Sequence, residues 1–284
     1  MKANNKAFCK YSNEATFDSG VESLKLYLPV QDGFINYNIV HSVVKNSNCD
    51  TWRLSVVYFC DCEFNCIRPL TRSGAEWEMA LKLVGRPDFI GGYAHGDELY
   101  EKIALTVDGK IYKPTEINDL TSFDELSFEV WSKGFDPNDS VSEALYHYKK
   151  ITVDKKKVSV DQEVKWLNSY ELKNSYLAMM PLLKSETDLY RIGKEGEYSP
   201  IPESLSLSEK KDIDAIYMLG SKGFIFSLEV NKYLTFGDNE NQYLLSDNGG
   251  VPYNKMYFIL NHGGSVAEGD IWNTTTVYTI EKRS

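Results

Sequence analysis

The residues best suited to chemistry lie close together between positions 76 and 98. Tyr93 and His95 stand in a glycine-flanked turn, and either could move a proton, because histidine titrates near neutral pH and tyrosine is a weak acid. Arg86 could neutralise a substrate carboxylate, and Glu78 or Glu98 could orient the histidine. We therefore assign the candidate catalytic roles to Tyr93, His95, Arg86, Glu78 and Glu98.

The same segment allows two other kinds of chemistry. Glu76 and Glu78 would lie about 7 Å apart on one face of a strand, and paired carboxylates serve glycoside hydrolysis. A divalent ion held by His95, Asp97 and Glu98 is a further alternative, since imidazole and carboxylates bind such ions. Apart from that alternative, the sequence indicates no cofactor and no metal. The structural alternative is a solvated strand face followed by a turn that the histidine orders.

A wider set of residues is suited to hold a sugar. Aromatic rings stack on the apolar faces of sugar rings, and charged side chains can bind hydroxyl groups. Some of these residues belong to the segment 76–98, and others stand on strand-like runs elsewhere. The candidate substrate-binding residues are Glu76, Lys82, Asp88, Arg53, His147, Tyr253, Lys255 and Tyr257.

Three of the five cysteines form a C-x-C-x3-C pattern at Cys60, Cys62 and Cys66. A structural zinc site usually has a second pair of ligands, and none follows. Cys60 and Cys62 share the parity of Trp52 on a strand-like run, so the pattern predicts packing as small apolar side chains. The odd number of cysteines also disfavours a disulfide framework.

Alternation of apolar residues with a period of two predicts the elements that must position these side chains. Such alternation occurs in the runs 24–30, 35–43, 103–107, 126–130, 158–166, 224–230 and 253–259. Asp108-Gly109, between two such runs, predicts a tight hairpin. We expect an all-β fold, an antiparallel β-sandwich of the jelly-roll type with at most a short helix. The spacing of Ser208, Ile213, Ile216 and Tyr217 places that helix near residues 208–217.

Length and charge predict the domain organisation, the partners and the location of the protein. A chain of 284 residues can form one β domain, and we expect an N-terminal arm over 1–18 and a single β-sandwich domain over 19–284. The net charge of −10 disfavours nucleic acid and membrane surfaces as partners. Neither a leader-like apolar stretch nor a run of about 18 apolar residues occurs. We expect a protein that is cytoplasmic as synthesised, with later release or association with a virion left open. The sequence carries no signal for an oligomeric state.

The strand-rich pattern, the run Glu76-Trp77-Glu78 and the Tyr-His-Tyr-Lys run around His147 resemble the concanavalin-type jelly-roll carbohydrate-active enzymes. The hydrolases of that group carry Glu-x-Asp-x-x-Glu, and this chain lacks the middle Asp and the final Glu. The lyases carry Gln-x-His and Tyr-Phe-Lys strands, which the runs around His147 and Tyr257 approximate. The resemblance implies a polysaccharide lyase that degrades an acidic glycan by Tyr/His proton abstraction. The alternatives are a non-catalytic glycan-binding or phage structural or attachment module, and a glycoside hydrolase with paired carboxylates.

Overall fold

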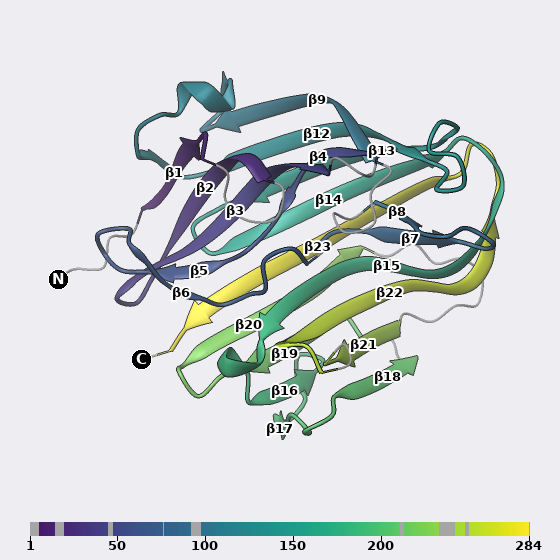
Figure 1. Ribbon diagram of the computed structural model, residues 1–284. Helices are drawn as coiled ribbons and strands as arrows, with labels where there is room; N and C mark the ends of the chain where they lie inside the picture. Colours follow the sequence, from purple (N-terminus) through teal and green to yellow (C-terminus); the bar gives the residue numbers. More distant parts are fainter. Residues whose placement is uncertain are drawn as a thin grey trace.

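The computed structural model describes residues 6–14, 20–44, 48–75, 77–91, 98–210, 213–232, 242–247 and 250–283. Within these residues the chain forms two β-sheets, one of 17 strands and one of six. The smaller sheet packs against one face of the larger sheet (Figure 1). Buried apolar side chains from both sheets form one shared core. The predicted all-β sandwich is therefore confirmed. No helix in the described ranges is long and apolar enough to cross a membrane.

The larger sheet takes its strands from most of the chain. Its strands are β1 (Ala7–Ser12), β2 (Gly20–Val30), β3 (Gly33–Val44), β4 (Cys49–Leu54), β5 (Tyr58–Cys60), β6 (Cys66–Pro69), β9 (Glu98–Val107), β10 (Lys110–Tyr112), β11 (Thr121–Phe123), β12 (Leu126–Phe135), β13 (Glu143–Val153), β14 (Lys157–Trp166), β16 (Leu189–Ile192), β17 (Ser199–Pro200), β19 (Ala215–Leu219), β20 (Phe224–Lys232) and β23 (Ile271–Lys282).

The smaller sheet and two single-turn 3-10 helices complete the described structure. The strands of the smaller sheet are β7 (Ala80–Leu83), β8 (Phe89–Ile90), β15 (Tyr170–Leu183), β18 (Ser206–Lys210), β21 (Gln242–Ser246) and β22 (Tyr253–Val266), and the 3-10 helices are η1 (Pro114–Glu116) and η2 (Lys184–Glu186).

Pairing in the larger sheet is almost entirely antiparallel. Its main row of neighbours runs β16, β19, β20, β23, β14, β13, β12, β9, β4, β3, β2 and β1. The pair β4–β9 is parallel, and its register covers two residue pairs, Cys49 with Glu98 and Asp50 with Leu99. Beyond this point β9 pairs with β10, while β4 continues beside β3.

Alternation along the strands explains why this sequence forms a sandwich. In β12 every second residue, from Leu126 through Phe128 and Val130, is buried against the core, and the residues between them are partly exposed. A strand turns successive side chains to opposite faces, so this pattern gives each strand one inner and one outer face. The core includes Phe128 of the larger sheet and Phe258 of the smaller sheet, both fully buried.

The hairpin expected at Asp108-Gly109 is confirmed. Asp108 has φ 48° and Gly109 has φ 78°, and these two residues connect β9 to β10. A two-residue turn with positive φ at both positions matches the right-handed twist of the strands that flank it. Because glycine and aspartate tolerate positive φ better than most residues, this short motif could be recognised from sequence.

The helix expected near residues 208–217 is wrong. Ser206–Lys210 form β18, which pairs with β21, and Ala215–Leu219 form β19, which pairs with β16 and β20. Ile216 and Met218 are fully buried, two residues apart, so the burial follows the period of a strand. The helical spacing was coincidental, and strand pairing decided the local structure.

The N-terminal segment contributes to the larger sheet. Ala7–Ser12, inside the expected arm 1–18, form β1 and pair with both β2 and β11. Ala7 and Cys9 are fully buried in the core, so this part of the segment is packed. The division into an arm and a domain over 19–284 stays a prediction.

The cysteine-rich segment differs from the packing interpretation. Cys60 and Cys66 form a disulfide that joins β5 to β6, whereas Cys62 is free and exposed. The segment between them turns sharply, with Phe64 at φ 66°. Because the turn brings two cysteines of the same hairpin together, an odd total did not prevent one disulfide.

Candidate functional site

A group of polar side chains lies on the inner face of the larger sheet, among residues that are otherwise apolar. On β13, His147 and Lys149 take inner positions between Leu145 and Ile151, with exposures of 3% and 2%. On β14, Gln162 takes an inner position and is also buried. Buried polar groups cost free energy unless they are paired, so these side chains need partners within the core.

A β-bulge turns Glu98 toward this group. In the pairing of β9 with β12, Lys102 lies opposite Trp131 and Tyr100 lies opposite Ser132, which leaves Glu101 as an extra residue. The bulge reverses the alternation along β9, so that Glu98 points inward like Leu105 despite the odd separation. Glu98 is 3% exposed.

Glu98 and His147 form a carboxylate–imidazole pair. Glu98 Oε1 lies 3.1 Å from His147 Nδ1, and the Thr51 hydroxyl lies 3.5 Å from the same oxygen. Burial alone would raise the pKa of Glu98, but the charge and hydrogen bond of His147, together with Lys149 and Ser132, outweigh it and lower the pKa to about 2. Glu98 is therefore a carboxylate at neutral pH and favours a proton on Nδ1.

The other ring nitrogen of His147, Nε2, has no such partner in the residues that the structure describes. Nε2 is buried, and no residue in the described part of the chain forms a hydrogen bond with it. When the imidazole is neutral and Nδ1 carries the proton, Nε2 holds a lone pair. An oriented imidazole with one free nitrogen is the geometry of a general base.

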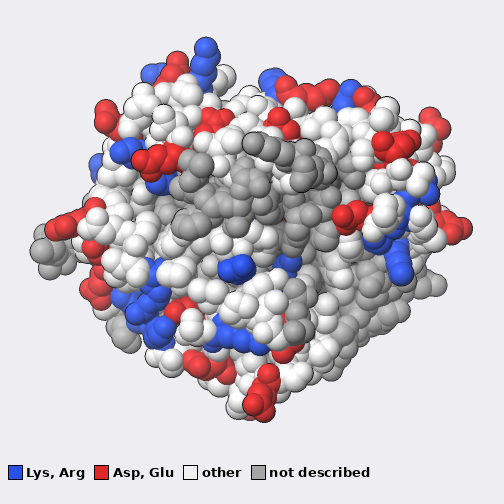
Figure 2. Space-filling view, in the orientation of Figure 1, with Lys and Arg blue, Asp and Glu red and all other residues white. Residues whose placement is uncertain are grey.

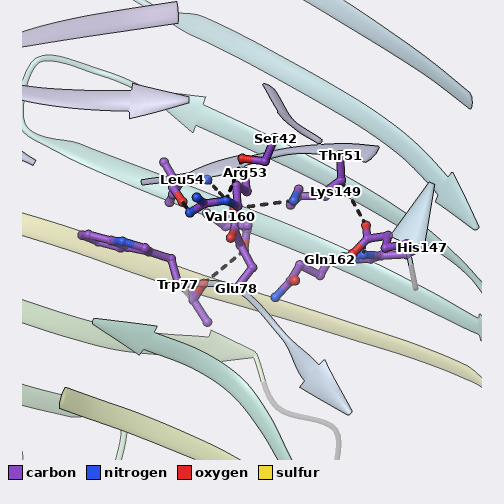
Figure 3. Close-up of polar contacts among 12 residues, drawn as sticks. Ser42, Thr51, Arg53, Leu54, Trp77, Glu78, His147, Lys149, Val160 and Gln162 are labelled. Carbon is purple, nitrogen blue, oxygen red and sulfur yellow. Dashed lines mark hydrogen bonds and ion pairs between the residues drawn. The ribbon is translucent and has the colours of Figure 1, made fainter. Parts of the chain in front are cut away.

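Glu78 and Lys149 form a second buried pair. Glu78 Oε1 accepts a hydrogen bond of 2.7 Å from the backbone N–H of Leu54 and lies 3.5 Å from Lys149 Nζ. Arg53 donates from Nη1 to the carbonyl oxygen of Leu54 at 3.1 Å and from Nε to the Ser42 hydroxyl at 2.9 Å. Both polar groups of the Leu54 backbone are thus bound by charged side chains (Figure 3). Leu54 lies on β4 beyond Asp50, the last residue of that strand paired with β9.

We call the residues Thr51, Arg53, Glu78, Glu98, His147 and Lys149 the inner cluster. Thr51 and Arg53 come from β4, Glu78 from the segment before β7, and His147 and Lys149 from β13 (Figure 3). Glu98, from β9, joins them through its contact with His147. With Met79 they enclose a cavity of about 10 Å³, which is room for about one water molecule. Within the described ranges, no three histidine, cysteine or acidic side chains are grouped so as to hold a metal ion.

Four of the residues expected from sequence come together in the inner cluster: Arg53, Glu78, Glu98 and His147. The strand on which Glu76 and Glu78 were expected to share a face begins later in the structure, so Glu78 was not placed correctly. Only Ala80–Leu83 form β7, and the chain bends at Glu78, so that both Trp77 and Glu78 are buried. Because alternation stops at the bend, Glu78 is buried and does not lie on a solvated strand face.

Three other expected residues lie apart from the inner cluster, near the β7–β8 connection. Arg86 forms a bidentate pair with Asp136, at 2.5 and 2.7 Å, so its guanidinium already has a carboxylate partner. Lys82 donates to the Pro87 carbonyl oxygen at 2.9 Å. Asp88 accepts the backbone N–H of Phe89 at 2.8 Å. These contacts order the turn, and a substrate role for these residues stays a prediction.

The remaining expected residues fall on β22 or outside the described ranges. Lys255 and Tyr257 on β22 of the smaller sheet are buried, and Lys255 Nζ lies 5.0 Å from the ring centre of Tyr257. Tyr253 begins the same strand. The residues that lie outside the described ranges are Glu76, Tyr93, His95 and Asp97.

Sequence reasoning missed Thr51, Lys149 and the supporting Ser132. A usable signal existed for Lys149, which falls on the apolar parity of β13 with Leu145 and Ile151. A lysine at such a position must be paired or functional. No comparable signal existed for Thr51 or Ser132, because small hydroxyl residues are common on both faces of strands.

The protein is thus an all-β sandwich in which ionisable side chains are buried on the inner face of the larger sheet.

No protein-family model matches the sequence, and no curated protein matches it. Solved structures do match in fold. The GH36 α-galactosidase AgaB from Geobacillus stearothermophilus matches with a TM-score of 0.56 and 9% identity, over 92% of this chain and 40% of that chain. A substituted form of AgaA from the same organism, in complex with stachyose, matches with a TM-score of 0.56 and 8% identity, over 92% of this chain and 41% of that chain.

The galactosidase domain of the α-galactosidase–sucrose kinase AgaSK is a further match, with a TM-score of 0.53 and 8% identity over 91% of this chain and 40% of that chain. This chain thus spans about two-fifths of the length of these proteins. At such low identity the likeness establishes the fold alone. The matched proteins act on carbohydrates, in agreement with the resemblance seen in the sequence, but they are galactosidases and not polysaccharide lyases.

Proposed function

We propose that this chain is a carbohydrate-active protein and that His147 moves a proton to or from a bound sugar. One observation carries the proposal: His147 is oriented by Glu98 through Nδ1, while Nε2 is buried without a hydrogen-bond partner among the described residues. A structural histidine of the core would be expected to satisfy both nitrogens. His41 of the same sheet does so, with Glu22 at 2.8 Å and Asp50 at 2.6 Å.

The other members of the inner cluster take supporting roles in this proposal. Glu98 fixes the ring and stabilises the imidazolium that forms when Nε2 accepts a proton. Lys149 and Arg53 place positive charge near the ring, which would stabilise a negatively charged oxygen on the substrate. These roles suit proton abstraction beside a sugar carboxylate, which is the lyase reaction. Tyr93 and His95 remain the sequence-based candidates for the acid that completes it.

Glycoside hydrolysis is the second candidate, and the kind of protein that shares the fold favours it. It would use Glu78 and Glu98, which the inner cluster brings together. Because the pKa of Glu98 is lowered to about 2, Glu98 would be the nucleophile or base. Glu78, which is paired with Lys149, could serve as the acid only after that pair is broken. A non-catalytic glycan-binding module is a third candidate, favoured by the small size of the enclosed space.

Product analysis on the full chain tests the proposal and separates these candidates. The purified protein is incubated with raffinose, stachyose and soluble uronic-acid polysaccharides. Near-ultraviolet absorbance then reports unsaturated ends from a lyase, and a reducing-end assay reports hydrolysis. We expect turnover in one assay, reduced by about 100-fold or more in His147→Gln, the usual contribution of a general acid or base.

His41→Gln is the matched control, because it removes a histidine whose two nitrogens already have carboxylate partners. It should retain turnover. Equal turnover in the wild type and in folded His147→Gln would rule out the proton-transfer role. Binding of a glycan without turnover would identify a binding module, and neither binding nor turnover would reject the proposed function altogether.

A further inference from the structure

A row of side chains crosses the outer face of the larger sheet, opposite to the core. Trp131 of β12 lies opposite Tyr148 of β13, Tyr148 lies opposite Glu163 of β14, and Glu163 lies opposite Asn273 of β23. The residues that flank each of them along the strand are buried and face inward. With neighbouring strands about 4.8 Å apart, the row is about 14 Å long.

Two neighbouring hollows lie along this row, and together we call them the outer groove. The first has a volume of about 420 Å³, within the usual range for small-molecule sites, and the second has about 170 Å³. The hollows share Tyr148 and Glu163. The first is lined by Glu101, Trp131, Tyr146, Tyr148, Glu163 and Lys165, and also by the buried residues Ser132 and His147. The second adds Asp161, Asn273 and Thr275.

Aromatic rings give the outer groove a rigid apolar surface. The rings of Trp131 and Tyr148 lie 5.2 Å apart, and Lys102 Nζ lies 4.6 Å from the Trp131 ring centre. The Tyr148 hydroxyl donates to Glu129 at 2.8 Å, and burial together with this hydrogen bond raises the pKa of Tyr148. Tyr146 remains 39% exposed, so its ring is accessible to a ligand. Such pre-fixed rings bind with little loss of entropy.

The charges of the lining select among ligands that stack on aromatic rings. In the first hollow Glu101 is paired with Lys133 at 3.2 Å, and Lys102 and Lys165 add positive charge. The second hollow is lined by two carboxylates, Asp161 and Glu163, and, among the described residues, by no ammonium group. The charge of the second hollow repels an anionic ligand, whereas its carboxylates and the Asn273 amide can exchange hydrogen bonds with hydroxyl groups. The chemistry fits a ligand with apolar ring faces, many hydroxyls and no negative charge.

We propose that the outer groove is a binding site for a neutral oligosaccharide, with sugar rings on Trp131 and Tyr146 and sugar hydroxyls bound by Glu163 and Lys165. Most of the outer groove lies on the opposite face of β13 from the inner cluster, because alternation turns Tyr146 and Tyr148 outward and His147 inward. His147 lines both the first hollow and the inner cavity. The outer groove adds a glycan-holding surface to the proposed function and does not depend on proton transfer by His147.

Isothermal titration of the full chain with stachyose, cellotetraose and tetragalacturonate tests this proposal. We expect at least one neutral tetrasaccharide to bind and tetragalacturonate to bind more weakly. Trp131→Ala and Tyr146→Ala should each weaken the neutral interaction about 10-fold, as for an aromatic residue at the centre of an interface. Tyr146 is exposed, so its variant keeps the test valid if Trp131→Ala does not fold.

Tyr112→Ala is the matched control, since Tyr112 also stacks with a lysine, at 4.7 Å from Lys110 Nζ, but lies outside the outer groove. It should bind like the wild type. Titration detects binding whether or not turnover occurs, so binding without turnover would support this proposal while rejecting the proposed catalysis, and turnover without binding at the groove would do the reverse. The proposal is overturned if no neutral tetrasaccharide binds, or if both groove variants bind as tightly as the wild type.

Discussion

Replacing Glu98 with glutamine should flatten the acid side of the stability profile. The pKa of this carboxyl is lowered from an ordinary value of 4.5 to about 2 in the folded protein. A carboxyl with a lowered folded-state pKa stabilises the fold above its unfolded pKa, and the stabilisation disappears as the pH falls through the folded value. The difference corresponds to about 3 kcal/mol at neutral pH, of which roughly 2 kcal/mol is lost by pH 3.

Urea denaturation at steps between pH 3 and pH 6 measures this effect. We expect the free energy of unfolding of the wild type to fall by about 2 kcal/mol more than that of Glu98→Gln over this range. The exposed Glu125→Gln serves as the control and should follow the wild type. Parallel curves for the wild type and Glu98→Gln would refute the reasoning, because they would show that His147 and Lys149 do not hold the carboxyl in its charged form.

Three further outcomes follow from contacts described above. Lys149→Met should lower the free energy of unfolding by about 3–5 kcal/mol, because it leaves the buried carboxylate of Glu78 without its partner. In a double-mutant cycle, adding Glu78→Gln should restore part of the lost free energy. Additive losses from the two substitutions would contradict the pairing. Gly33→Ala should cost about 1–3 kcal/mol in thermal or urea unfolding, since a Cβ would lie 2.1 Å from the Cys60 carbonyl oxygen, and an unchanged midpoint would count against this close approach. Thiol titration should find one fast-reacting cysteine, Cys62, in the native protein and three after unfolding without reductant; five after unfolding would exclude the disulfide.

The sequence predicted the regular parts of the fold well. Strands such as β12 and β14 bury every second residue along their length, and that period is directly visible in the sequence. The hairpin at Asp108-Gly109 was recognisable because its turn needs positive φ at both positions. The error at residues 208–217 arose because a short apolar pattern fits both periods and strand partners decide between them.

The site was only partly predictable. Arg53, Glu78, Glu98 and His147 were chosen as residues, yet their grouping was not foreseen. Glu98 reaches the group through a bulge, and Glu78 through a bend that ends the alternation. Both are irregularities of the backbone that leave no period in the sequence. The group also depends on strands that are distant in the chain, and their pairing is a property of the whole sheet.

The extra residue in β9 affects how this chain can be compared with any relative. In a protein that lacks a counterpart of Glu101, the carboxylate facing the imidazole would stand at a neighbouring position in the sequence. An alignment without a one-residue gap at this place would match Glu98 to a side chain on the opposite surface. Relatives of this protein are therefore better found by superposing structures than by aligning sequences. The presence or absence of the inserted residue is itself a feature by which such relatives can be compared.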